Sequence, residues 1–104
     1  MAQFDVYHNL NKETNQIIPY LLDVQADLLN GLSTRVVVPL IAAAAMGKAI
    51  RHLNPQFQIG DARVIMSTAE LAGVPTTAIG EKVGSLTEQH DEIIAALDFL
   101  FIGF

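Results

Sequence analysis

The sequence lacks cysteine altogether, and only 16% of its 104 residues are charged. Without cysteine the chain has no disulfide framework and no thiol chemistry. Basic residues are scarce as well: six lysines and arginines stand against eleven aspartates and glutamates, which gives a net charge of −5. An acidic chain repels phosphate backbones, so we expect no direct nucleic-acid binding by the protein alone.

A long apolar run and a leader peptide are also missing. The longest apolar run, "VVVPLIAAAAM" at 36–46, is too short to span a bilayer and contains Pro39. The first residues, "MAQFDVYHNL", have neither a basic start nor an apolar segment, and so do not resemble a signal peptide. We therefore expect a cytoplasmic protein with no membrane partner.

Hydrophobic residues, in contrast, make up 51% of the chain. A chain of this length forms one domain, which we expect to span residues 1–104, and buries only a modest core. This hydrophobic content is rich for a small monomer. We therefore predict that part of it covers an interface, either in a homo-oligomer or with another partner.

Alternating and β-branched segments predict a mainly β fold. The expected strands are "QFDVYH" at 3–8, a segment within "IIPYLLDVQADLL" at 17–29, "TRVVVPLI" at 34–41, "PQFQI" at 55–59 and "ARVIMS" at 62–67. Turns are expected at Asn30-Gly31 and Gly60-Asp61, and Val74-Pro75 is expected to be extended. The stretch "AAAAMGKAIRHL" at 42–53 predicts a helical turn or an irregular crossing, because Gly47 weakens its helical character.

The C-terminal segment predicts one helix, from about Leu86 to about Phe101. Ser85 and Glu88 have the spacing of a capping box. The apolar residues that recur at helical spacing are Ile93, Ile94, Leu97, Leu100 and Phe101. We expect Leu97 to contribute to the core, and Phe99, Leu100 and Phe101 to be shared between the sheet and a second copy of the chain. Because the apolar surface exceeds half the circumference, one stripe packs on the sheet and the other needs a second cover.

No catalytic, cofactor-binding or metal-binding constellation is evident. His8, His52 and His90 are far apart in the sequence, and no two have metal-ligand spacing on one element. The chain has no glycine-rich phosphate loop and no nucleophile elbow. We therefore expect a protein that is not an enzyme and needs no cofactor. Asp98 lies at the negative end of the helix dipole, where it either faces water or meets a cationic partner.

Several segments together resemble the CcdB family, the gyrase-poisoning toxins of ccd toxin–antitoxin modules. The segments are "MAQFDVY" at 1–7, "LLDVQADLL" at 21–29, "TRVVVPL" at 34–40, "STAELAGVP" at 67–75 and "IIAALDFLFIGF" at 93–104. The resemblance runs nearly end to end. It implies a small SH3-like antiparallel barrel or sheet with one C-terminal helix, as in MazF and Kid, and a two-fold homodimer.

The resemblance also implies function and partners. Such a toxin binds the A subunit of DNA gyrase and traps the cleaved gyrase–DNA complex, and a CcdA-like antitoxin neutralises it. Plasmid maintenance and autoregulated transcription belong to the same expectation. The positions that correspond to the family's gyrase-binding residues are Ile102, Gly103, Phe104, Asp98, Ala26, Leu28, Gln3, Phe4 and Tyr7.

One departure from the family lies in the last three residues. The family pattern is Trp-Gly-Ile, and this chain has Ile102, Gly103 and Phe104. The family's tryptophans sandwich an arginine of gyrase, a cation–π contact that Ile102 does not make. Asp98 stands where the family has an asparagine, and its charge offers a substitute attraction.

Two alternatives remain open beside the gyrase poison. The first is an endoribonuclease toxin of the MazF or Kid type, since those toxins share the expected fold and fold does not fix function. The acidic charge weighs against it, because RNA cleavage needs a basic groove and an acid–base pair. The second is a non-toxic homologue that only dimerises and binds antitoxin, which Ile102 makes plausible.

Overall fold

The computed structural model describes residues 1–104 as an antiparallel sheet with one α-helix. The strands are β1 (Asp5–Asn9), β2 (Tyr20–Asp23), β3 (Thr34–Ala42), β4 (Gln56–Ile59), β5 (Ala62–Met66), β6 (Ala72–Pro75) and β7 (Ile79–Ser85). The helix α1 (His90–Ile102) follows the last strand. Short 3-10 helices occur at η1 (Asp27–Leu29), η2 (Thr68–Glu70), η3 (Thr76–Ala78) and η4 (Thr87–Gln89). The prediction of a mainly β fold with one C-terminal helix is confirmed.

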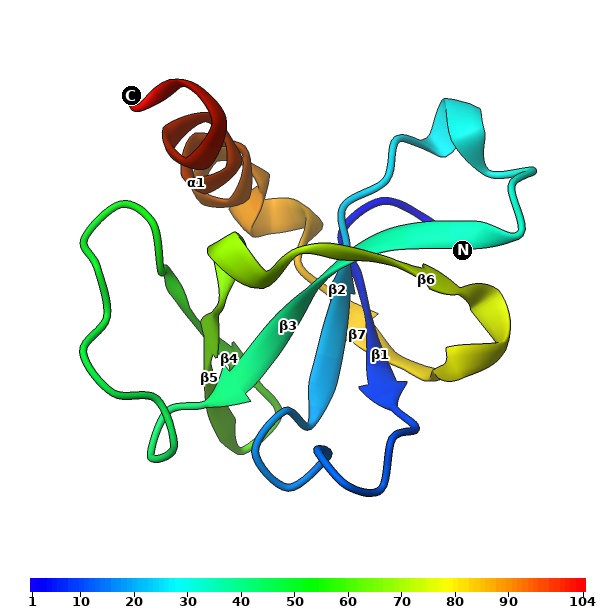
Figure 1. Ribbon diagram of the computed structural model, residues 1–104, viewed down its shortest axis with the longest axis horizontal. Helices are drawn as coiled ribbons and strands as arrows, with labels where there is room; N and C mark the ends of the chain where they lie inside the picture. The colour runs from blue at the N-terminus through cyan, green and yellow to red at the C-terminus, as the bar shows by residue number, and fades with distance from the viewer.

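The 7-stranded sheet has the order β4-β5-β3-β2-β1-β7, and β6 pairs with β3 outside this path. Strand β3 is central to the sheet, because it pairs with β2 along one edge and with both β5 and β6 along the other (Figure 1). Residues 34–37 of β3 pair with β6, and residues 40–42 pair with β5. Pro39, which has no N–H to donate, lies near the change of partner, and its carbonyl accepts a bond from Ser67 N at 2.9 Å. The sheet curves into a half-barrel.

The hydrophobic core lies between the curved sheet and α1. Its 12 buried members are Phe4, Val6, Leu22, Val38, Leu40, Phe57, Ile59, Val64, Met66, Leu86, Ile93 and Ala96. Ile93 and Ala96 are 0% exposed, and Leu97 packs against this cluster as a partly buried neighbour. The first half of α1 therefore covers the sheet, whereas its last turn extends beyond it (Figure 1). None of the helices has the length and apolar character needed to cross a bilayer.

Strand β7 is the element that the sequence analysis missed. It pairs with β1 through two register irregularities, and it contains Gly80 and Gly84. A Cβ atom at Gly80 would lie 2.9 Å from the Cβ atom and the carbonyl oxygen of His8. Close approach of β1 thus requires glycine at this position. The same glycine lowers the strand propensity of the segment and hides it from pattern analysis.

The start of the helix also differs from the prediction. The 3-10 turn Thr87–Gln89 precedes α1, which begins at His90. Ser85 ends β7, and its Oγ accepts a hydrogen bond from Thr87 N at 3.2 Å. The capping box predicted from Ser85 and Glu88 is therefore wrong, because the strand continues through Ser85 and leaves no room for an N-cap of α1 there.

The expected packing of Phe101 on the sheet is wrong as well. Its side chain is 67% exposed, because the last turn of α1 has no sheet beneath it. Ile94, two turns earlier on the same face of the helix, is 40% exposed. Phe99 is half-buried, and its ring centroid lies 6.3 Å from that of His52 in the loop before β4. Part of the apolar surface of α1 is left uncovered within the protomer.

Candidate partner-binding surface

The C-terminal residues form an apolar group at the free end of α1. Gly103 has a φ of 82°, and its N–H donates to the carbonyl of Phe99 at 3.0 Å, so the helix ends in a left-handed turn. Glycine suits this turn because it adopts a positive φ without steric cost. Ile102 is 59% exposed and Phe104 is 86% exposed. Together with Phe101 they form the apolar end of α1, a surface that the protomer does not cover.

Asp98 lies one turn before this group on the exposed side of α1. It is without an ion pair or a side-chain hydrogen bond. Ile94, Asp98 and Phe101 recur at the i, i+4 and i+7 spacing of one helix face. The free carboxylate is thus bordered by exposed apolar side chains.

The N-terminal arm, residues 1–4, contacts the end of β2 and η1. Gln3 N donates to Asp27 Oδ1 at 2.7 Å, and Gln3 Nε2 donates to Val24 O at 3.2 Å. Phe4 has a φ of 71°, and its N–H donates to Asp23 O at 2.6 Å. These bonds attach the arm to the segment between β2 and η1.

Phe4 and Tyr7 lie beneath the surface. Their side chains are 8% and 5% exposed. Phe4 belongs to the core cluster, and its ring stacks 6.3 Å from that of His90. Tyr7 donates its hydroxyl proton to Asp5 Oδ2 at 3.2 Å. Both residues therefore support the arm and β1 and offer a partner very little area.

The exposed part of this region is η1 and its flanks. Ala26 is exposed, and Leu28 has a relative exposure of 94%, above that of the other exposed large hydrophobic side chains. Two parts of the candidate site result: the arm with η1, and the apolar end of α1. In the view of Figure 1 both lie at the top of the molecule, the end of α1 on the left and η1 on the right. No hydrogen bond or ion pair joins them within the protomer.

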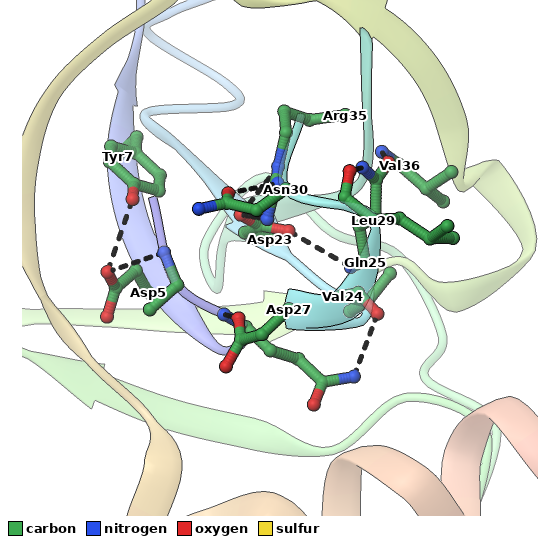
Figure 2. A network of polar contacts seen from close by, with 12 residues as sticks. Asp5, Tyr7, Asp23, Val24, Gln25, Asp27, Leu29, Asn30, Arg35 and Val36 are labelled. Carbon is green, nitrogen blue, oxygen red and sulfur yellow. Dashed lines mark hydrogen bonds and ion pairs between the residues drawn. The ribbon is translucent and has the colours of Figure 1, made fainter. Parts of the chain in front are cut away.

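A buried polar network underlies η1 (Figure 2). Arg35 donates to Asp23 Oδ2 through Nε at 3.0 Å and Nη2 at 2.5 Å, and through Nη1 to Asn30 Oδ1 at 2.7 Å. Gln25 donates to Leu29 O and accepts from Val36 N, both at 2.9 Å. The sequence pattern did not predict a role for Gln25, Asp27, Asn30 and Arg35. A single arginine within the apolar "TRVVVPL" strand was the available signal, because a buried guanidinium needs a partner.

Burial raises the pKa of two acidic groups in this region, the Asp23 carboxyl and the Tyr7 phenol. It raises the pKa of the Asp23 carboxyl above its ordinary value, while the hydrogen bonds from Arg35 and from Gln25 N oppose the shift. Burial also raises the pKa of the Tyr7 phenol, and the neighbouring Asp5 carboxylate adds to that increase. The two shifts belong to packing and to the network beneath the surface.

The histidines are distributed over the molecule. His8 lies beside Tyr20, His52 beside Phe99 and His90 beside Phe4. No group of three or more histidine, aspartate or glutamate side chains converges in a way that could hold a metal ion.

The largest cavity, about 400 Å³, lies between the loop after β1 and the β3–β6 region. Its lining is mostly apolar, and includes Leu21, Pro39 and Val74. The arrangement of the molecule suits binding through exposed apolar side chains.

Comparison with known proteins gives a family and a fold. Residues 3–103 match the family model described as CcdB protein. An endoribonuclease from a mycobacterial species superposes with a TM-score of 0.74 at 14% identity, covering 96% of this chain and 89% of that chain. A second mycobacterial endoribonuclease, solved in complex with its cognate antitoxin, gives a TM-score of 0.73 at 14% identity, covering 96% and 93%. At this identity the two structures establish similarity of fold only.

Proposed function

The chain belongs to the CcdB family of toxins from toxin–antitoxin modules, and we propose that it binds the A subunit of DNA gyrase and traps the gyrase–DNA cleavage complex. The observation that carries this proposal is the apolar end of α1. Ile102 and Phe104 are 59% and 86% exposed at the position where the family makes its contact with gyrase. An uncovered apolar group with a fixed backbone suits recognition of a protein surface.

The mechanism is one of binding, without chemistry by the toxin itself. Phe104 and Ile102 enter the target as an apolar knob; Ile102 ends α1, and Gly103 sets the direction of Phe104 after the helix. Asp98 supplies a carboxylate one turn away, which attracts an arginine that Ile102 does not hold by a cation–π contact. Gyrase with toxin bound then fails to reseal the DNA that it has cleaved.

The proposal includes a homodimer. The apolar face formed by Ile94 and Phe101 lacks a cover in the protomer, and a second copy of this chain provides one while leaving Ile102 and Phe104 free for the target. A two-fold axis near this face also duplicates the knob. Dimerisation thus accounts both for the excess of hydrophobic residues and for a target that is itself a dimer.

A CcdA-like antitoxin is the second proposed partner, and the module operates in the cytoplasm, where gyrase acts. Support comes from the family and from the structural neighbour solved with its cognate antitoxin. Antitoxin binding neutralises the toxin and removes it from gyrase. Plasmid maintenance and autoregulation of transcription are the corresponding roles of such a module.

The endoribonuclease reading is the second candidate, because both structural neighbours are endoribonucleases. Against it stand the net charge of −5 and the separation of the histidines onto different elements. The non-toxic homologue is the third candidate, and it predicts antitoxin binding without any effect on gyrase. The three candidates differ in what they do to purified gyrase and to RNA.

One experiment separates them. Purified protein is added to gyrase, supercoiled plasmid and ATP, and the reaction is stopped with detergent and protease. The gyrase poison yields linear plasmid in proportion to protein, and a parallel incubation leaves cellular RNA intact. Sequence-specific RNA cuts together with unaltered plasmid would instead establish the endoribonuclease. Neither effect, with antitoxin still bound, would establish the non-toxic homologue.

A further inference from the structure

Leu28 is an exposed apolar side chain on a loop whose backbone is held in place. At 94% exposure it contributes nothing to the protomer core. The backbone on either side of it, in contrast, is bonded to the rest of the molecule through side chains. This combination of an uncovered side chain and a restrained backbone calls for an explanation other than folding.

Three side-chain hydrogen bonds restrain η1: one at its first residue, one at its last residue, and one at the residue that follows it. Asp27, at the start, accepts from Gln3 N at 2.7 Å. Gln25 donates to Leu29 O at 2.9 Å while its other amide atom accepts from Val36 N of β3 at 2.9 Å. Asn30, directly after η1, accepts from Arg35 Nη1 at 2.7 Å.

The anchor points of these attachments are themselves fixed. Arg35 is 1% exposed and pairs with Asp23, which is 0% exposed. Gln25 is 6% exposed, and its own N–H donates to Asp23 Oδ1 at 3.0 Å. Two of the restraints on η1, through Gln25 and Asn30, therefore lead into the buried network, whereas Asp27 is held by the backbone of Gln3 at the surface (Figure 2).

We propose that Gln25, Asp27, Asn30 and Arg35 act as positioning residues that present Leu28 as a preformed anchor for the protein target. The inference rests on the proposed function, because the target is the gyrase A subunit. A loop that is already ordered loses little conformational entropy on binding, and this favours affinity. An apolar side chain on such a loop then acts as an anchor that enters a pocket of the partner.

Asn30 offers the sharpest test, because it is exposed and is not itself a member of the buried Asp23–Arg35 ion pair. Asn30→Ala removes the acceptor for Arg35 Nη1, whereas Asn30→Asp keeps an oxygen at that position. Gln58→Ala is the matched control, since Gln58 is an exposed amide on β4 with one side-chain bond, to Gly60 O at 3.1 Å. The variants are compared by hydrogen exchange at the amides of Leu29 and Asn30 and by the concentration needed to linearise plasmid with gyrase.

Asn30→Ala should speed exchange at these two amides about 3- to 10-fold and raise the required toxin concentration by a similar factor, as expected for one lost hydrogen bond. Asn30→Asp and Gln58→Ala should behave as the parent protein does. Leu28→Ala should reduce poisoning at least as much as Asn30→Ala and leave the melting temperature unchanged.

Unchanged exchange or unchanged poisoning in Asn30→Ala would overturn the inference, as would full poisoning by Leu28→Ala. A parent protein that leaves plasmid supercoiled would refute the proposed function and the anchor role together. Slowed exchange in the parent relative to Asn30→Ala would then show that the loop restraint alone is correct. The two failures are therefore distinguishable.

Discussion

Arg35 and Asp23 form an ion pair inside the protein, with 2.5 Å between Nη2 and Oδ2 and side chains that are 1% and 0% exposed. Removing both charges from water is costly, and the cost is offset only when the remaining polar atoms are also bonded. Here Asn30 and Gln25 supply those bonds, and no buried side-chain nitrogen or oxygen lacks a partner. The pair therefore fixes the conformation of the segment between β2 and β3.

Removal of one partner should be far more harmful than removal of both. Asp23→Ala leaves a guanidinium buried without its counter-charge and should lower the free energy of unfolding by about 3–5 kcal/mol. The double variant Asp23→Leu, Arg35→Met should recover part of this loss, and urea unfolding measures both. Lys82→Ala is the control: Lys82 is 56% exposed and lies 3.4 Å from Asp5, so it should cost about 0–1 kcal/mol. An equally small cost for Asp23→Ala would contradict the role of the pair.

The buried phenol of Tyr7 should make the protein sensitive to alkali. Its pKa is raised in the folded state by burial and by Asp5. Its contribution to stability is therefore fully present below the ordinary tyrosine pKa of about 10 and is lost as the pH rises through the raised value. Above pH 10 the parent should lose up to about 1.4 kcal/mol per pH unit more than Tyr7→Phe, which cannot ionise. Parallel curves of unfolding free energy against pH for the two proteins would refute this.

The two ends of α1 should respond differently to truncation of side chains. Ile93→Ala removes a side chain that is 0% exposed and should cost about 2–5 kcal/mol in unfolding free energy. Phe101→Ala removes one that is 67% exposed, and should change protomer stability by less than about 1 kcal/mol. Sedimentation should show a dimer for the parent at micromolar concentration and a weaker dimer for Phe101→Ala. A large loss of stability in monomeric Phe101→Ala would place that ring in the core after all.

The sequence predicted much of the fold because its local signals agree with the tertiary structure. Strand β3 has a nearly continuous β-branched run, and the Gly60-Asp61 turn separates β4 from β5 as expected. Strand β7 escaped prediction because close approach of His8 demands Gly80, whose lack of a side chain removes the usual strand pattern. Phe101 was misplaced for a different reason: helical spacing identifies a face but does not say where the sheet beneath it ends.

The candidate site was predictable only in part. The exposed tail follows from the apolar end of the sequence and from Gly103. The residues beneath η1 did not, because Gln25, Asn30 and Arg35 are brought together by the pairing of β2 with β3 and not by a local motif. Phe4 and Tyr7 came from the family resemblance, which maps positions along the chain without showing that both side chains are buried.

Asp98 should contribute to the proposed action on gyrase through its charge. Asp98→Ala should raise the toxin concentration needed for plasmid linearisation about 2- to 5-fold, and Asp98→Lys should raise it further, because like charges would meet. The effect should shrink as salt increases. Glu92→Lys is the matched control, since Glu92 is an exposed acid on another face of α1. Equal poisoning by the parent and both Asp98 variants would show that this carboxylate faces only water.

Deletion of Ile102 to Phe104 should separate target binding from folding. The three residues are exposed, and their attachment to the rest of the protein is confined to the end of α1, where Ile102 is the last helical residue and Gly103 N donates to Phe99 O. The truncated protein should therefore keep its melting temperature within a few degrees and keep its affinity for antitoxin, because a hydrogen bond lost at an exposed helix end contributes only about 0.5–1.5 kcal/mol. It should no longer linearise plasmid with gyrase, since the apolar knob is gone.

A variant with Gly103→Ala refines the test, because the positive φ of 82° disfavours a side chain and should misdirect Phe104 without removing it. Unfolding on truncation would make the tail part of the core, and a folded truncation that still traps cleaved DNA would place the gyrase contact elsewhere on the protein.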